Sequence, residues 1–463
     1  MSDRSTSCCH LPENAPFHSY EDVIHHLDSL GLFHMDMGLG RMERALSALE
    51  LNSLHCPVVQ IVGTNGKGST STFLQSIAMA HGLHVGLYTS PHFVYPEERI
   101  KLDHTMLPRR VWPAFAGEAV CVEKDLTYFE LLTVLAASAF ERSDCQLMIF
   151  EAGLGGRYDA TTALPADMVC FVPMGLDHTG VLGDTIAAIA DDKSDALRPG
   201  MSMAVSAPQP RDAQRIIERK ASERGIPLCA TPSRYGCDGT DEGLALWNTL
   251  PADLRQLAVL PEDAKLGLHG PYQRINAQTA LLAWVLLCHK YGWKTDAAAI
   301  ARGLERAFIP GRLQYAEAQG ERPALWLDGA HNTHGMEALL EAIADRDAMP
   351  ADRRPGAIVF SCLGDKEPEK LAAMLARASE LLDDAPIFVP PIADNPRAAV
   401  PAELAALLRD AGPRVAATPS ADISEALTAA QFVAGSKPIL VCGSLYMLGE
   451  VFALWPELLV PQK

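Results

Sequence analysis

The sequence lacks the features that mark several large classes of protein. None of its 11 cysteines forms a Cys-x-x-Cys pair, the spacing common in zinc ribbons and thiol–disulfide oxidoreductases. No apolar run approaches the roughly 20 residues needed to cross a bilayer. The polar residues 1–10 contain no apolar core of a secretory signal. We therefore expect a cytoplasmic chain with reduced, mostly buried thiols and no membrane partner.

Positive charge is also scarce. Lys and Arg number 39 against 57 Asp and Glu, which gives a formal net charge of −18. A diffuse acidic surface disfavours nucleic acid as a partner, whereas a small anionic ligand needs only a local basic pocket. The 463 residues are enough for two or three domains.

Apolar strands and helices alternate along the first part of the chain. Strands are expected at 58–62, 84–88, 147–150, 168–172 and 201–205. Helices are expected at 69–80, 129–141, 184–197, 212–224 and 275–291. Residues 226–268 contain several Gly and Pro and are interpreted as peripheral strands and loops. Such alternation is typical of a parallel sheet covered by helices on both faces.

A second alternating run follows the turn at Pro310-Gly311. Its expected strands are 325–327, 357–360, 387–389, 415–417 and 439–441. Its expected helices are 335–344, 369–380, 401–409 and 424–433. The sequence thus predicts an α/β protein with a first domain at 1–309 and a smaller second domain at 310–463.

A phosphate-binding loop is predicted between the first strand and the first helix of this alternation. Glycines let backbone N–H groups turn towards phosphates, the helix N-terminus adds positive partial charge, and a lysine supplies a full charge. The loop departs from the G-x-x-x-x-G-K-[ST] form, because a glycine follows the lysine. A glycine-rich turn with an incidental lysine is the alternative interpretation. The candidate ATP-binding residues are Thr64, Asn65, Gly66, Lys67, Gly68 and Ser69.

Glu151 ends a central strand and precedes the run Ala-Gly-Leu-Gly-Gly-Arg. A carboxylate at this end of a parallel strand is well placed to bind a hard cation such as Mg²⁺. The glycine run lacks the third glycine of a dinucleotide-binding fingerprint, so that interpretation is weak. Taken alone, Ser90 reads as a turn or cap serine, His178 as a surface or core histidine, and Lys193 as a solvated helix lysine.

Several segments together resemble, in order along nearly the whole chain, the folate branch of the Mur-ligase superfamily. That branch comprises folylpolyglutamate synthases and bifunctional dihydrofolate synthases. Cell-wall members usually place Ser or Thr directly after the lysine, so Gly68 favours the folate branch. The segments are residues 63–69, 88–92, 126–130, 151–161, 175–179, 271–276, 310–314 and 327–332.

The resemblance implies a site for two Mg²⁺ ions. Its ligands would be Ser90, Glu151, His178 and Lys193, the last as a carboxylated lysine. Two departures stand near these residues. Thr162 replaces an Asn of the family, and Ser194-Asp195-Ala196 replaces Ala-Gly-Ile.

The resemblance also implies roles in ATP binding and catalysis. Asn276 would contact the adenine end, Arg312 the phosphates, and Asp328 the ribose or adenine edges. Lys67, His178 and His331 would be catalytic, with His331 near the γ-phosphate. The first domain would be a P-loop ATPase with a parallel sheet. The second would have a Rossmann-like fold similar to dihydrofolate reductase.

The pterin or folate substrate is assigned, by the same resemblance, to two segments: Thr127, Tyr128, Phe129 and Glu130, and Gly155, Gly156 and Arg157. Aromatic rings in the first segment could stack on a flat pterin. A helix capping box formed by Thr127 and Glu130 is the structural alternative, and both interpretations can hold together.

The function implied is ATP-dependent ligation of L-glutamate through an acyl phosphate. The acceptor would be dihydropteroate or the γ-carboxyl of a reduced folylpolyglutamate. ATP, Mg²⁺ and these small molecules would be the only partners of a monomer. One alternative is a Mur-type ligase acting on a cell-wall precursor. A nucleotide switch with a phosphate loop, from a different class, would show nucleotide-dependent partner binding and no acid-dependent ATP turnover.

Overall fold

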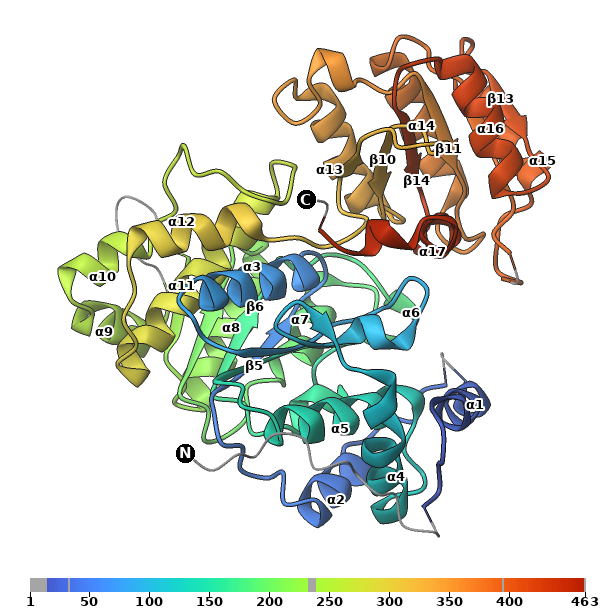
Figure 1. Ribbon diagram of the computed structural model, residues 1–463. Coiled ribbons are helices and arrows are strands. Elements are labelled where there is room, and N and C mark those ends of the chain that lie inside the picture. The colour runs from blue at the N-terminus through green and yellow to red at the C-terminus, as the bar shows by residue number, and fades with distance from the viewer. Residues whose placement is uncertain (1–14, 32–33, 232–238, 394, 462–463) are drawn as a thin grey trace. The chain divides into compact units, whose positions relative to one another are not determined.

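The computed structural model describes residues 15–31, 34–231, 239–393 and 395–461 (Figure 1). The chain divides into two compact units. The first comprises the residues up to 264 together with 276–304, and the second comprises 265–275 and 305–463. The functional boundary between residues 309 and 310 stays a prediction.

The first unit is built on an eight-stranded sheet of order β4-β3-β2-β5-β1-β6-β7-β8. β3 pairs antiparallel with both β2 and β4, and the other pairs are parallel. All five residues of β1 are buried, as expected for a strand covered on both faces. The strands are β1 Val58–Val62, β2 Val85–Tyr88, β3 Ile100–Leu102, β4 Thr105–Met106, β5 Leu147–Glu151, β6 Met168–Phe171, β7 Met203–Ser206 and β8 Leu228–Ala230.

The helices of this unit pack their apolar residues on the sheet and on each other. They are α1 Tyr20–Leu30, α2 Gly40–Ala48, α3 Lys67–Ala80, α4 Trp112–Val122, α5 Tyr128–Glu141, α6 Thr179–Leu182, α7 Ile186–Ser194, α8 Arg211–Glu223, α9 Asp241–Thr249, α10 Ala252–Leu257, α11 Gln273–Tyr291 and α12 Ala297–Arg306. Single 3₁₀ turns are η1 Pro96–Arg99, η2 Arg109–Val111 and η3 Ala160–Ala163.

One prediction for this unit was wrong in part. Residues 226–268 were expected as strands and loops, but they contain the helices α9 and α10 after strand β8. Thr240 caps α9 by accepting a hydrogen bond from the Gly243 N–H at 3.2 Å. Pro251 directly precedes α10. The prolines and glycines here bound short helices instead of interrupting them.

The second unit contains a six-stranded sheet of order β13-β12-β11-β14-β10-β9, parallel except for the edge strand β9. The strands are β9 Gln314–Ala316, β10 Leu325–Asp328, β11 Ala357–Phe360, β12 Ile387–Val389, β13 Ala417–Pro419 and β14 Ile439–Cys442. The helices are α13 Thr333–Ala344, α14 Pro368–Leu381, α15 Pro401–Ala411, α16 Ile423–Ala434 and α17 Leu445–Leu454, with 3₁₀ turns η4 Ala351–Arg353 and η5 Pro456–Leu459. Both units thus have the predicted α/β class.

Each unit has its own apolar core. Helix α11 is apolar all round, and its central residues 280–288 are buried. Among the helices that the structure describes, none combines the length and apolarity needed to cross a membrane.

Candidate active site

The functional loops of the first unit leave its sheet at one edge. β2, β5, β1 and β6 are neighbouring parallel strands, and the register places Ile61 opposite both Glu151 and Cys170. Because the carboxyl ends of parallel strands meet at the same edge, the loops after these four strands emerge together.

The loop after β1 is hydrogen-bonded to the loop after β6. The backbone N–H groups of Thr64 and Asn65 donate to the carbonyl oxygen of Pro173 at 3.1 and 3.2 Å. The Thr64 hydroxyl donates to the Gly175 carbonyl at 3.1 Å and accepts from the Gly175 N–H at 3.0 Å. These bonds fix the path of the chain between β1 and α3.

Gly66 forms the turn into α3. Its φ of +95° lies in the left-handed region that favours glycine. A Cβ atom here would overlap the side-chain amide of Asn276, which is itself buried on α11. Lys67 begins the helix and donates from Nζ to the carbonyl oxygens of Gly63 and Thr64 at 3.3 and 3.2 Å. A lysine, a helix N-terminus and a buried amide therefore meet at one loop.

Gly68 and Ser69 lie in the first turn of α3. Ser69 is buried, with 4% of its surface exposed. Residues 64–66 thus form the loop between β1 and α3, and residues 67–69 form the first turn of the helix, which begins two residues before its predicted start at 69.

Two of the predicted metal ligands are adjacent. Glu151 is the last residue of β5 and is 4% exposed. Its Oε2 atom accepts a hydrogen bond from the Ser90 N–H at 3.1 Å. The His178 side chain is 49% exposed, and its Nε2 lies 3.7 Å from the Asp177 carboxylate. The first unit thus offers a buried carboxylate with a serine beside it, and a solvent-facing imidazole.

Lys193, on α7, is only 4% exposed. Burial, and to a smaller extent the positive charge of Lys67, lower the pKa of its ammonium group to about 7. The carboxylates of Asp159, Asp192 and Asp177 act in the opposite direction. The interpretation of Lys193 as a solvated helix lysine was therefore wrong.

The turn after β5 packs directly on α7. A Cβ atom at Gly156 would overlap the backbone of Lys193, so only glycine allows this approach. The Gly156 N–H donates to Asp192 Oδ1 at 2.9 Å. The Thr162 hydroxyl donates to the Gly156 carbonyl at 2.7 Å. Thr162, in the position of the family's Asn, thus supports the turn. Gly155 lies against the same Asp192 carboxylate.

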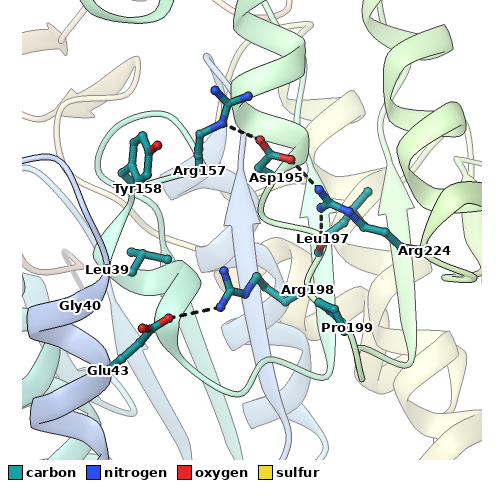
Figure 2. Close-up of a pocket in the computed structure, with 10 residues that line it drawn as sticks. All are labelled: Leu39, Gly40, Glu43, Arg157, Tyr158, Asp195, Leu197, Arg198, Pro199 and Arg224. Carbon is teal, nitrogen blue, oxygen red and sulfur yellow. Dashed lines mark hydrogen bonds and ion pairs between the residues drawn. The ribbon is translucent and has the colours of Figure 1, made fainter.

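Arg157 lines a cavity of about 660 Å³ in the first unit (Figure 2). Its guanidinium donates to Asp195 at 2.6 Å, and Arg224 donates to the same carboxylate at 2.6 Å. Arg198 lies 3.4 Å from Glu43 across the cavity wall. The three guanidinium groups exceed the two carboxylates, so the lining carries net positive charge. The remaining lining residues are Leu39, Gly40, Tyr158, Leu197 and Pro199.

The first predicted substrate segment begins α5 with a capping box. The Glu130 N–H donates to the Thr127 hydroxyl at 3.4 Å, and the Glu130 carboxylate accepts from the Thr127 N–H at 2.8 Å. Arg41 binds the same carboxylate through two bonds of 3.0 Å. The capping-box interpretation is confirmed.

The aromatic residues of this segment lie at different depths. Tyr128 is buried, with the Arg99 guanidinium 5.5 Å from its ring centre. Phe129 is partly buried against Gly153, where a Cβ atom would overlap its ring. The Phe129 ring therefore lies against the turn that follows Glu151.

In the second unit, the three residues predicted to bind ATP or act in catalysis, Arg312, Asp328 and His331, lie around the end of β10. The buried Asp328 carboxylate accepts from the Leu313 and Ala330 N–H groups at 2.7 and 2.8 Å. Burial raises the pKa of Asp328, and the charge of Arg312 opposes this effect. The Arg312 guanidinium lies against the Gly329 backbone, and His331 Nδ1 hydrogen-bonds the Gly329 carbonyl at 2.8 Å.

Four residues that support these sites were not predicted. Pro173 accepts two loop N–H groups, Asp192 holds the glycine turn, and Arg41 pairs with Glu130. Tyr272, in the second unit, lies near Asp328 and Arg312; burial raises its pKa, the charge of Asp328 raises it further, and the charge of Arg312 opposes both effects. Only Asp192 gave a sequence signal, by its position next to Lys193.

Comparison with known proteins places the chain among ligases. The family model described as "Mur ligase, glutamate ligase domain" matches residues 311–445. The dihydrofolate synthase/folylpolyglutamate synthase of Escherichia coli is 30% identical over 431 residues, covering 92% of this chain and 93% of that protein. The structure of E. coli FolC in complex with DHPP and ADP has a TM-score of 0.74 at 27% identity, covering 95% and 98% of the two chains. A bifunctional folylpolyglutamate synthase/dihydrofolate synthase with Mn, AMPPNP and L-glutamate bound also has a TM-score of 0.74, at 26% identity, covering 96% and 99%.

Proposed function

Because the chain belongs to the family of dihydrofolate synthases/folylpolyglutamate synthases, we propose that it uses ATP to join L-glutamate to dihydropteroate and to reduced folylpolyglutamates. The observation that carries the proposal is the register of β1 with β5, which brings a phosphate loop and the buried Glu151 to one sheet edge. A triphosphate and a hard cation would meet there.

ATP is proposed to bind first through its phosphates. Lys67 would exchange its two bonds to loop carbonyls for bonds to phosphate oxygens, a stronger charge-assisted interaction. Asn276 lies against Gly66 and would position the nucleotide from the side of α11. In the second unit, Arg312, Asp328 and His331 share one strand end and would supply a cation, an acceptor and an imidazole to a nucleotide.

The donor set of the first unit fits Mg²⁺. Ser90 and Glu151 supply hard oxygen atoms at one place, and His178 is exposed enough to turn towards an ion. Lys193, as a neutral amine, could add CO₂ and lose a proton, and the resulting carbamate would be an additional anionic ligand. Two Mg²⁺ ions held here would neutralise charge that develops on the transferred phosphoryl group.

The acid substrate is proposed to occupy the space bounded by Phe129 and the turn that contains Gly155 and Gly156. Its remote carboxylates would face the basic cavity of Arg157 and Arg198. Tyr128 and Glu130 would support the position of Phe129 without contacting the substrate, because Tyr128 packs under Arg99 and Glu130 caps α5.

The chemistry follows from the need to activate a carboxylate. A carboxylate oxygen attacks the γ-phosphorus, ADP leaves, and an acyl phosphate forms. The glutamate amine then attacks the acyl carbon, phosphate leaves, and the amine loses a proton to give an amide. The chain is further proposed to act as a cytoplasmic monomer.

Phosphate release with Mg-ATP tests this function. Dihydropteroate, tetrahydrofolate or a cell-wall nucleotide precursor is supplied in turn, with and without L-glutamate. We expect turnover only with the pterin acids and glutamate. Release independent of the acid, or only with the cell-wall precursor, would overturn the proposal.

An isotope experiment tests the acyl phosphate. With ¹⁸O in the substrate carboxylate, one labelled oxygen should appear in the released phosphate. The departing labelled oxygen appearing in AMP or in water, and not in phosphate, would exclude this route. Lys67→Ala should lower kcat at least about 100-fold without changing the circular dichroism spectrum.

A further inference from the structure

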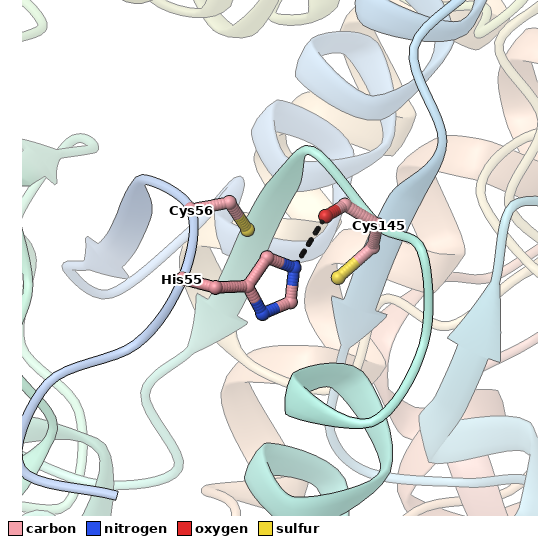
Figure 3. Close-up of side chains that lie close together, drawn as sticks. All are labelled: His55, Cys56 and Cys145. Atoms are coloured by element: carbon pink, nitrogen blue, oxygen red, sulfur yellow. Dashed lines mark hydrogen bonds between the residues drawn. The ribbon is translucent and has the colours of Figure 1, made fainter. Parts of the chain in front are cut away.

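A cluster of metal-binding side chains lies at the opposite end of the first unit's sheet from the phosphate loop. His55 and Cys56 stand just before β1, and Cys145 stands just before β5 (Figure 3). Each offers one ligand atom, and these atoms lie within 4.8 Å of one another. Because β1 and β5 are parallel, their amino ends meet at this edge as their carboxyl ends meet at the other.

The separations suit a small tetrahedral ion. Zn–S bonds of about 2.3 Å and Zn–N bonds of about 2.0–2.1 Å imply ligand atoms roughly 3.5–3.8 Å apart in a tetrahedron. An ion would therefore need to draw the donor atoms together by at most about 1.3 Å. Side-chain rotation can supply this, since all three residues lie outside the strands.

His55 is already oriented as a metal ligand would be. Its Nδ1 faces Glu141 Oε2 at 2.8 Å, and the same oxygen accepts from the His55 backbone N–H at 3.0 Å. A carboxylate on one ring nitrogen commonly fixes a histidine that binds metal through the other. That other nitrogen, Nε2, lies 2.7 Å from the Cys145 carbonyl oxygen. Binding an ion through Nε2 would replace this contact with the Cys145 carbonyl, while Nδ1–H keeps its bond to Glu141.

We propose that His55, Cys56 and Cys145 bind one Zn²⁺ ion, with water in the fourth position and Glu141 as the carboxylate that orients His55. Two thiolates and an imidazole form a donor set that favours Zn²⁺ over Mg²⁺. Binding releases the two thiol protons as two Zn–S bonds form. The Cys145 side chain is buried and that of His55 is partly exposed, so the ion can enter from solvent.

The ion would join the segment before β1 to the turn between α5 and β5. Its contribution is stability of the first unit, because a ligand that binds only the folded state adds to its free energy of unfolding. This site is independent of the ligase activity proposed above.

Co²⁺ is a suitable spectroscopic probe, since thiolate ligands give it a characteristic charge-transfer absorption. The metal-free full-length protein, kept reduced, is titrated with Co²⁺ alone and then with Zn²⁺. We expect one equivalent of thiolate-bound Co²⁺, displaced by Zn²⁺, and a rise in Tm with Zn²⁺. Cys56→Ser and Cys145→Ser should each abolish the charge-transfer band. Cys121→Ser, which removes an exposed thiol outside the cluster, should leave it unchanged.

Two further variants keep both thiols, in case loss of the buried Cys145 prevents folding. His55→Gln should weaken Zn²⁺ binding, and Glu141→Gln should weaken it by about 10- to 100-fold. An unchanged band in the Cys56→Ser variant, or unchanged Zn²⁺ affinity in His55→Gln and Glu141→Gln, would overturn the site. Absence of any thiolate-bound Co²⁺ in the reduced wild-type protein would do the same.

Discussion

The protonation of Lys193 gives a direct test of the proposed metal site. With a pKa of about 7, about three quarters of this side chain is neutral at pH 7.5. An ordinary lysine with a pKa of about 10.4 would be neutral in only about one molecule in a thousand. Only the neutral amine can add CO₂, and burial makes the neutral fraction of Lys193 several hundredfold larger than that of a surface lysine.

Three observations should follow if the carbamate acts in catalysis. Lys193→Ala should lower kcat at least about 100-fold, and added acetate should restore part of the activity by replacing the missing carboxylate. Lys193→Arg should be equally inactive but should not respond to acetate, because its guanidinium stays charged. Wild-type activity should fall as the pH drops below about 7, where Lys193 becomes protonated.

The carbamate itself is observable by ¹³C NMR in buffer that contains labelled bicarbonate. Lys290→Ala, which removes a lysine at the protein surface near Asp167, serves as the control and should retain the signal and the activity. Full activity of Lys193→Arg would refute the reasoning. The reasoning would also be refuted if Lys193 gave no ¹³C carbamate signal and the enzyme kept its full activity after CO₂ was removed.

Three other predictions concern packing and charge. Gly66→Ala should raise the KM for ATP, because the new Cβ displaces Asn276. Gly82 has a similar positive φ but open space around it, so Gly82→Ala should leave this KM unchanged. Steady-state kinetics of both variants separates backbone strain from the displacement of Asn276. Trp284→Ala should lower the free energy of unfolding of the first unit by about 3–5 kcal/mol in urea, because the ring is fully buried, and an equal loss in an exposed-site control, Met35→Ala, would contradict this. Burial would raise the pKa of Asp195, but its hydrogen bonds to arginine and lysine lower this pKa to about 2. The charged carboxylate therefore stabilises the fold above the pKa of the unfolded state, and this stability is lost as the pH falls towards 2. Asp195→Asn should flatten the acid limb of the Tm–pH curve, and an unchanged limb would refute the assignment.

Periodicity predicted the central strands well because they are short, apolar and buried on both faces. Strand β1 was placed at its observed bounds, and β5 was one residue short at Glu151. Peripheral elements were harder to predict. The strands β3, β4 and β9, at or next to a sheet edge, have few residues and depend on their partners for hydrogen bonds, so they carry little signal of their own.

The candidate site divides in the same way. The phosphate loop was predictable because its chemistry depends on consecutive residues. The burial of Lys193 could not be read from the local pattern, since the residue that packs against its backbone, Gly156, lies nearly forty positions earlier in the chain. The cluster of His55 with Cys145 was not predictable at all, because the alignment of two parallel strands brings these residues together.

The departure from the family at Ser194-Asp195-Ala196 has a physical explanation. The Ser194 hydroxyl donates a hydrogen bond to the Ala190 carbonyl at 2.6 Å within α7, so this buried polar group is satisfied inside its own helix. Asp195 is bound by Arg157, Lys220 and Arg224 at 2.6–2.9 Å, so its charge is matched by cations from the turn after β5 and from the C-terminal end of α8. Neither change requires Lys193 to leave its buried position. Asp195 also holds Arg157 at the wall of the basic cavity. The residue that replaces the family's glycine after Lys193 therefore positions a charge that would attract an acidic substrate.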